Sequence, residues 1–336
     1  MKIIRKIAAA SAILALTAGA ALAAEPATLK LSTAAPENTV WGMQVNRLAE
    51  AIAEESEGRL KVEPFFNSQL GNENDTLAQL ARGRIDMGVF TVNAAALQAP
   101  GVGLFQLFSY YDSNAQRACV QQEHLSDEMR AQLADKGVYF GGWAEVGNVY
   151  IMSNREIHGI EDLQGLKAGI SVNKYTTEFW KALGANPVPV NPAEVASGLS
   201  TGLIDLYATV YSFYIPTGMN KIAPVVSEFN IASQPGMFAV SQRVMDRLAP
   251  EDQAAIKRAF ARFPADMIMN EILAFEDQIR KLHKNMGGAI YQPSDEAIAA
   301  FRDRLPAYWD AMFGDFGEEG LRIKQMIDDG KAACGS

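Results

Sequence analysis

The stretch that decides the fold is LQGLKAGISVNKY, residues 163–175. It reads as a turn, a short apolar strand over 167–171 and a polar stop at Ser171, Asn173 and Lys174. A helical stretch follows over 176–183 and ends at Gly184, and 186–190 reads as the next strand. This order predicts a βαβ unit. Gly169 lies in the first strand, where a side chain could reach a ligand at the strand end.

The same alternation occurs in the N-terminal half. Strand signals at 28–33, 61–66 and 87–92 are separated by helical stretches over 38–58 and 74–84. The chain therefore predicts two α/β halves with a mainly parallel sheet. An apolar stripe at helical spacing follows over 268–286. It predicts a core-facing helix, or a long helix that lies across both domains or forms a dimer seam.

Length and composition favour a globular protein of two domains. The chain has 336 residues, of which 49% are hydrophobic and 21% charged, and its formal net charge is −9. An acidic chain lacks the basic surface that nucleic-acid binding requires. We therefore expect no nucleic-acid partner.

The N-terminus predicts export. Lys2, Arg5 and Lys6 precede an uncharged apolar run over 7–22, and Ala21-Leu22-Ala23 matches a cleavage site. Residues 1–23 are thus expected to be a signal peptide, and the mature protein to be periplasmic. The alternative is a membrane anchor, but the run is shorter than the ~20 apolar residues of a span. Cys119 and Cys334 either pair, as an oxidising compartment allows, or remain separate thiols.

Catalytic signatures are missing from the sequence. His124, His158 and His283 have no metal-ligand spacing. The chain has neither a G-x-S-x-G elbow nor a phosphate-binding G-x-x-x-x-G-K-[ST] loop. We expect no enzyme activity, no metal and no cofactor. An exported two-lobed α/β protein of this kind favours a solute receptor that closes around its ligand.

Two stretches resemble a known family. FFNSQLGNENDTLAQLARGRIDMGV (65–89) and DLQGLKAGISVNKYTTEFWKALGANPVPVNPAEVASGLSTGLID (162–205) are similar to the solute receptors of tripartite ATP-independent periplasmic (TRAP) transporters. The S-Q-L-G turn, the G-x-I-D, the D-L-x-G-L-K and the A-L-G-A-N-P-V-P elements occur in the family's order. The resemblance covers about 28–327.

The resemblance implies a periplasmic-binding-protein-like fold: two α/β lobes, hinge strands and a long helix that spans both lobes. We expect lobe I to comprise 24–147 and 236–275, and lobe II 148–235 and 276–336. It also implies delivery of a small-molecule solute to TRAP permease membrane subunits, driven by an ion gradient without an ATPase. A monomer and a homodimer both remain possible.

Three positions depart from the family's anion-binding pattern. The strand after D-L-x-G-L-K usually carries an arginine that pairs with a substrate carboxylate, and here that position is Gly169. A second basic position corresponds to Val149, and a polar asparagine position to Thr209. These departures argue against the organic acids that most members bind.

Acidic and aromatic residues near these positions suggest another ligand. Glu145 shares strand parity with Val149, and Tyr207 and Tyr211 share it with Thr209. Such groups favour an ethanolamine-like amine or cation, or a neutral polar solute. The rings could instead belong to the core, and Glu145 could be salt-bridged. The predicted ligand-binding residues are Trp41, Phe90, Glu145, Val149, Gly169, Asn173, Tyr207, Thr209 and Tyr211.

Two alternatives for the ligand remain open. An organic acid could be bound if Lys174 or Arg155 replaced the missing arginine, with help from the helix that begins near Tyr175. A neutral ligand such as a polyol could be held by Asn173, Thr209 and tyrosine hydroxyls.

Overall fold

One mixed sheet runs through the molecule and joins its two halves. A computed structural model describes residues 26–171, 173–191 and 194–335. Within these residues the sheet has nine strands in the order β2-β1-β3-β8-β4-β7-β5-β6, with β9 paired to β8. The strands are β1 (Ala27–Thr33), β2 (Leu60–Phe65), β3 (Met87–Thr91), β4 (Val138–Ser153), β5 (Lys167–Ile170), β6 (Asn186–Pro189), β7 (Leu206–Val210), β8 (Val225–Ser241) and β9 (Ala289–Tyr291).

The long strands β4 and β8 connect the lobes. They pair with each other in antiparallel fashion, β8 also pairs with β3, and β4 with β7. The outer groups β1–β3 and β5–β7 are each internally parallel. The prediction of a mainly parallel sheet therefore holds for the two outer parts and is wrong in the middle. There the chain crosses between the lobes on two long strands, which pair directly.

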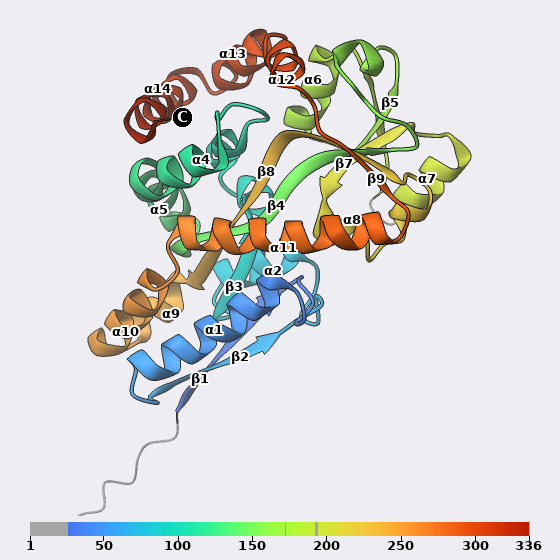
Figure 1. Ribbon diagram of the computed structural model, residues 1–336. Helices are drawn as coiled ribbons and strands as arrows, with labels where there is room; N and C mark the ends of the chain where they lie inside the picture. The colour runs from blue at the N-terminus through green and yellow to red at the C-terminus, as the bar shows by residue number, and fades with distance from the viewer. Residues whose placement is uncertain (1–25, 172, 192–193, 336) are drawn as a thin grey trace, which may run out of the picture.

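Helices cover the sheet in both lobes (Figure 1). Apolar side chains at helical spacing on the first helix are buried, as at Val45, Leu48 and Ile52. The helices are α1 (Val40–Glu55), α2 (Glu73–Ala81), α3 (Val92–Ala96), α4 (Asn114–Val120), α5 (Ser126–Ala134), α6 (Lys174–Ala182), α7 (Val195–Thr201), α8 (Tyr211–Tyr214), α9 (Gln242–Arg247), α10 (Pro250–Ala261), α11 (Ala265–Asn285), α12 (Asp295–Arg302), α13 (Pro306–Gly314) and α14 (Gly317–Cys334).

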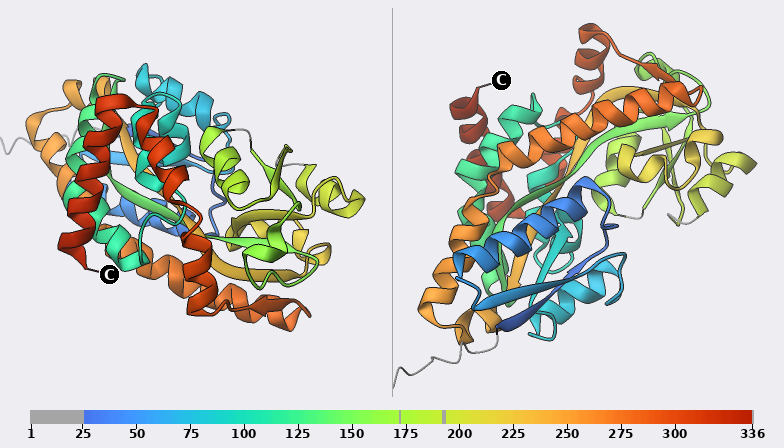
Figure 2. Two further views of the ribbon diagram at one scale, coloured as in Figure 1. Left: turned by 90° about the horizontal axis from the view of Figure 1, so that it is seen from above. Right: turned by 60° about the horizontal axis from the view of Figure 1, so that its bottom comes forward.

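The predicted long helix is α11, and it lies across both lobes. It contacts α1 and α4 in the first lobe and α8 and β9 in the second, and Figures 1 and 2 show it running along the strands that connect them. Ile268 and Ile272 are buried, whereas Leu282 is 44% exposed. The apolar stripe is therefore core-facing mainly in its N-terminal half.

The last helix differs from the expected lobe boundaries. We expected all of 276–336 in lobe II, but α14 packs against α4 and against the short helix η1 (Pro100–Gln106) of lobe I (Figure 2). The sulfurs of Cys119, in α4, and Cys334 are bonded to each other. The chain thus returns to the first lobe at its C-terminal end, where Ile323 and Ile327 of α14 share one apolar cluster with Val120 and Leu125.

No helix in the described ranges is both long enough and apolar enough to cross a membrane. The predicted signal peptide, residues 1–23, lies outside the described residues.

Candidate functional site

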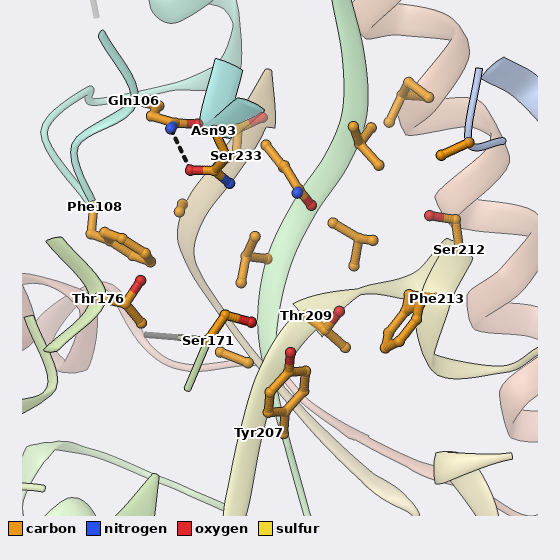
Figure 3. Close-up of a pocket in the computed structure, with 18 of the residues that line it drawn as sticks. Asn93, Gln106, Phe108, Ser171, Thr176, Tyr207, Thr209, Ser212, Phe213 and Ser233 are labelled. Atoms are coloured by element: carbon orange, nitrogen blue, oxygen red, sulfur yellow. Dashed lines mark hydrogen bonds between the residues drawn. The ribbon is translucent and has the colours of Figure 1, made fainter. Parts of the chain in front are cut away.

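A cavity of about 460 Å³ lies between the two lobes. One wall comes from the segment after β1, the start of α1, α3 and η1. The opposite wall comes from β5, α6, β7 and α8, while β4, β8 and α11 complete the lining. The carboxyl ends of β1, β5 and β7 meet here, which is where ligands bind in open α/β sheets. Figure 3 shows the side chains that project into this space.

Six of the nine predicted binding residues line the cavity. They are Trp41, Val149, Gly169, Asn173, Tyr207 and Thr209. Trp41 is placed by the first turn of α1, where the Thr39 side chain accepts a hydrogen bond from the backbone of Gly42. Asn173 caps α6, and its Oδ1 accepts from the backbone N–H of Thr176 at 2.8 Å. These local caps aim the starts of α1 and α6 at the cavity.

Glu145 is engaged elsewhere, which corrects its predicted role. Its carboxylate lies 2.8 Å from the guanidinium of buried Arg117. It also accepts hydrogen bonds from the backbone N–H of Gly147 and from the hydroxyl of Ser233. The register shift between Glu145 and Gly147 breaks the strand parity on which the prediction depended. As a result Val146, not Glu145, lines the cavity beside Val149.

Phe90 and Tyr211 are likewise absent from the cavity lining. Phe90 is buried, and its ring covers the backbone at Gly88. Strand β7 ends at Val210 and Tyr211 begins α8, so period-2 parity does not extend to Tyr211. Its hydroxyl donates to Glu228 at 2.5 Å in the interior. Both rings are core residues.

The two basic residues proposed as replacements for the arginine also lie outside the lining. Lys174 pairs with Asp315. Arg155 is exposed and donates to the backbone carbonyl of Asp162 at 3.2 Å. An acid could use either cation only after that side chain left its present partner.

Gly169 faces an occupied space. A Cβ added there would lie 2.6 Å from Cδ1 of Ile204 and 3.1 Å from a ring carbon of Tyr207. The side-chain direction that an arginine would follow is therefore filled by the lobe's own apolar groups. An arginine here requires Ile204 to move.

Several lining residues were not predicted from the sequence. They include Asn93, Gln106, Phe108, Ser212, Phe213, Ser233 and Phe275. Gln106 donates to Asn93 at 2.7 Å, which fixes this amide pair on the first-lobe wall (Figure 3). They come from separate helices, strands and loops, and no local pattern in the sequence groups them.

Tyr175 connects the lobes over the cavity. Tyr175 lies in the first turn of α6, and its hydroxyl donates to the backbone carbonyl of Pro100 in η1 at 3.3 Å. A Cβ on Gly103 would lie 2.8 Å from that hydroxyl, so only glycine leaves room for this approach. Burial raises the pKa of Tyr175 to about 12, and the ring stays neutral at physiological pH.

The described lining residues are all uncharged side chains: hydroxyls, amides, aromatic rings and aliphatic groups. Buried carboxylates lie just behind them. Glu276 in α11, next to lining residue Phe275, accepts from the backbone of Asn148 at 2.7 Å and from the hydroxyl of Tyr150 at 2.9 Å. Burial raises the pKa of Glu276, while those hydrogen bonds and the charge of Arg280 act in the opposite direction.

The described residues contain no group of three or more histidine, cysteine, aspartate or glutamate side chains placed to hold a metal ion. The histidines that the sequence analysis considered are also separate from the cavity. His283 is buried between Tyr214 and the carbonyl of Pro224.

Comparisons with known proteins match this geometry. Residues 31–315 match the family described as bacterial extracellular solute-binding protein, family 7. The chain is 30% identical to the sialic acid-binding periplasmic protein SiaP of Vibrio cholerae over 333 residues, which covers 94% of this chain and 97% of SiaP. These relatives are solute-binding receptors and not enzymes.

Two solved TRAP periplasmic solute-binding proteins have the same fold. One, from Chromohalobacter salexigens with bound D-glucuronate, has a TM-score of 0.81 at 20% identity and covers 91% of this chain and 99% of that one. The other, from Haemophilus influenzae with bound L-gulonate, has a TM-score of 0.81 at 18% identity and covers 90% and 99%. The two-lobed α/β architecture is thus confirmed.

Proposed function

This chain belongs to the bacterial extracellular solute-binding proteins of family 7, and from that premise we propose that it is the receptor of a TRAP transporter for a small polyhydroxylated solute. The observation that carries the proposal is the cavity between the lobes, at the ends of β1, β5 and β7. Its hydroxyl and amide groups suit a ligand with several hydroxyls. The loaded receptor would deliver its solute to the permease subunits in the membrane.

The class of ligand is narrowed by two observations. Glucuronate, L-gulonate and sialic acid, named for the relatives, favour an acid over the amine suggested by Glu145. Glu145 is itself paired with Arg117, which leaves no carboxylate for a cation there. Both observations disfavour an amine as the ligand.

A sugar acid is the second candidate, and the named ligands of the relatives favour it. Its carboxylate would lie near the start of α6, where Ser171, Asn173 and Thr176 offer neutral polar groups. Alternatively, Lys174 would leave Asp315 and turn toward the ligand.

The cellular setting follows from the same proposal. Residues 1–23 would direct export and be removed, and the receptor would act in the periplasm, where the named relative SiaP is placed. The protein would work as a monomer or a homodimer.

Thermal unfolding of the purified protein tests the receptor role. A panel of sugars, polyols, sugar acids and amines is added after partial unfolding and refolding to remove any co-purified solute. We expect one polyhydroxylated compound to raise the Tm in a concentration-dependent way, following RT ln(1 + [L]/Kd). Ala208→Trp, which fills the cavity, should abolish the shift, and Lys61→Ala on exposed β2 should not. No shift from any member of the panel would contradict the proposal.

A further inference from the structure

We infer that the cavity selects an uncharged polyhydroxylated solute, a neutral sugar or polyol, over the corresponding sugar acid or amino sugar. This inference rests on the proposed receptor function and narrows its ligand class. It separates this chain from the relatives whose named ligands are acids.

The first argument is the kind of polar group that faces the ligand. The amide pair of Asn93 and Gln106 lies on one wall, and the hydroxyls of Ser171, Tyr207 and Thr209 lie on the other (Figure 3). Amides and hydroxyls each provide both donors and acceptors. A sugar hydroxyl also donates and accepts, so it can match such a set, whereas a carboxylate only accepts.

The second argument is the aromatic lining. Phe108 and Phe213 border the cavity on different sides (Figure 3). Trp41 adds a third ring to the lining. Phe108 is held in place by a stacked contact with Phe179, with ring centroids 4.5 Å apart. Such rings bury the apolar C–H faces of a ligand while the polar groups orient its hydroxyls.

The third argument is that charged groups close to the lining already have partners. Lys174, between lining residues Asn173 and Tyr175, pairs with Asp315. Arg117 pairs with Glu145, and Arg280 lies 2.6 Å from Glu228. Both pairs lie behind the lining rather than in it. Among the described residues that line the cavity, a ligand ammonium therefore meets no carboxylate and a ligand carboxylate meets no guanidinium.

The buried carboxylates add a penalty against an acid. Glu276 and Glu228 share the single guanidinium of Arg280 near the β4 side of the cavity. When the lobes close, a carboxylate ligand would lose water near these acidic groups, and the described lining offers it no cation. An uncharged ligand avoids both the desolvation of an ion and this repulsion.

Matched ligand pairs provide the test. Calorimetry of the purified protein compares galactose with galacturonate, glucose with glucuronate and glucosamine, and sorbitol with gluconate. For the pair that gives measurable binding, we expect the uncharged sugar or polyol to bind at least about tenfold more tightly than the corresponding acid or amine. Tighter binding of the acid would overturn this inference and leave the receptor role intact. Binding by no member would instead count against the proposed function.

A charge introduced into the cavity provides the second test. Val149 lines the cavity and already carries a side chain, so Val149→Arg is the variant and Val149→Met its uncharged control of similar reach. We expect Val149→Arg to shift the acid-to-neutral affinity ratio by at least about tenfold toward the acid, and Val149→Met to leave it near the wild-type value. Circular dichroism checks that each variant folds, and Thr209→Lys replaces Val149→Arg if that variant does not.

An unchanged ratio in folded Val149→Arg would contradict the inference. That result would mean that an existing cation already binds the acid, or that a charge at position 149 does not affect the affinity for the ligand.

Discussion

Glu145 shows how one inserted residue changes the role of a side chain. An uninterrupted strand would place Glu145 and Val149 on one face, but the bulge at Val146 turns Glu145 toward Arg117. The carboxylate therefore stabilises the lobe instead of binding a solute.

Replacement of Glu145 tests this structural role. Glu145→Gln leaves Arg117 buried without its ion partner, and we expect a loss of about 3 kcal/mol in the free energy of unfolding. The Kd for the ligand found in the thermal screen should stay within about threefold of wild type. Urea unfolding and calorimetry measure the two quantities.

A double variant is the control for this prediction. Arg117→Met combined with Glu145→Leu removes both charges and should recover most of the lost stability. Strong weakening of ligand binding by Glu145→Gln, at unchanged stability, would restore Glu145 to the binding site.

At the scale of elements, α11 is fixed to the connecting strand β4 by Glu276. Its carboxylate accepts hydrogen bonds from Asn148 and Tyr150, which flank lining residue Val149. Gly147 has a φ of +140°, and a Cβ there would lie 3.0 Å from Oε1 of Glu276. The bulged part of β4 and helix α11 therefore pack closely against each other at the point where the lobes join.

This network predicts a pH dependence of stability. Because burial raises the pKa of Glu276 in the folded state above the ordinary value of 4.5, the folded state holds this proton more tightly than the unfolded state. The contribution of Glu276 to stability is therefore greatest at low pH and falls as pH rises through the folded-state pKa.

Glu276→Gln removes this titration. The difference in unfolding free energy, wild type minus variant, should decrease in urea titrations as the pH rises above the ordinary carboxyl pKa of 4.5. Asp266→Asn, at an exposed position in the first turn of α11, is the control for the loss of a carboxylate from this helix. A difference that grows with pH would contradict the raised pKa.

At the scale of the whole molecule, the disulfide closes the chain on itself. Cys119 and Cys334 are 215 residues apart, and their bond ties α14 to α4 in the first lobe. Such a bond stabilises chiefly by restricting the unfolded chain, and it forms in the oxidising compartment that a signal peptide would reach.

Removal of this bond should cost stability without changing the cavity. We expect Cys119→Ser/Cys334→Ser to lose about 2–4 kcal/mol in the free energy of unfolding and to become sensitive to proteolysis at α14. The ligand-induced shift in Tm should persist, since α14 does not line the cavity. Wild type measured with reductant is the control, and an unchanged urea midpoint in both would contradict the prediction.

Local patterns in the sequence predicted strands and helices of both outer parts of the sheet and the long helix α11, but not the long strands β4 and β8. The βαβ unit around 163–190, the α1 stripe and the length of α11 follow from periodicity and capping, which depend on neighbours along the chain. The family motifs likewise predicted the two-lobed receptor fold, and family membership is confirmed. Six of the predicted residues line the cavity, and Trp41, Gly169, Asn173 and Thr209 among them lie near helix starts or strand ends, which converge in open α/β sheets.

Only the tertiary structure decided which side chains face the solute. The bulge at Val146, the end of β7 at Val210 and the ion pair of Glu145 with Arg117 all depend on partners far along the chain. The same holds for the return of α14 to the first lobe. The sequence by itself determined the elements and the absence of an arginine at position 169. Long-range packing determined that neutral groups form the cavity lining, because it pairs each nearby charge with a partner behind that lining.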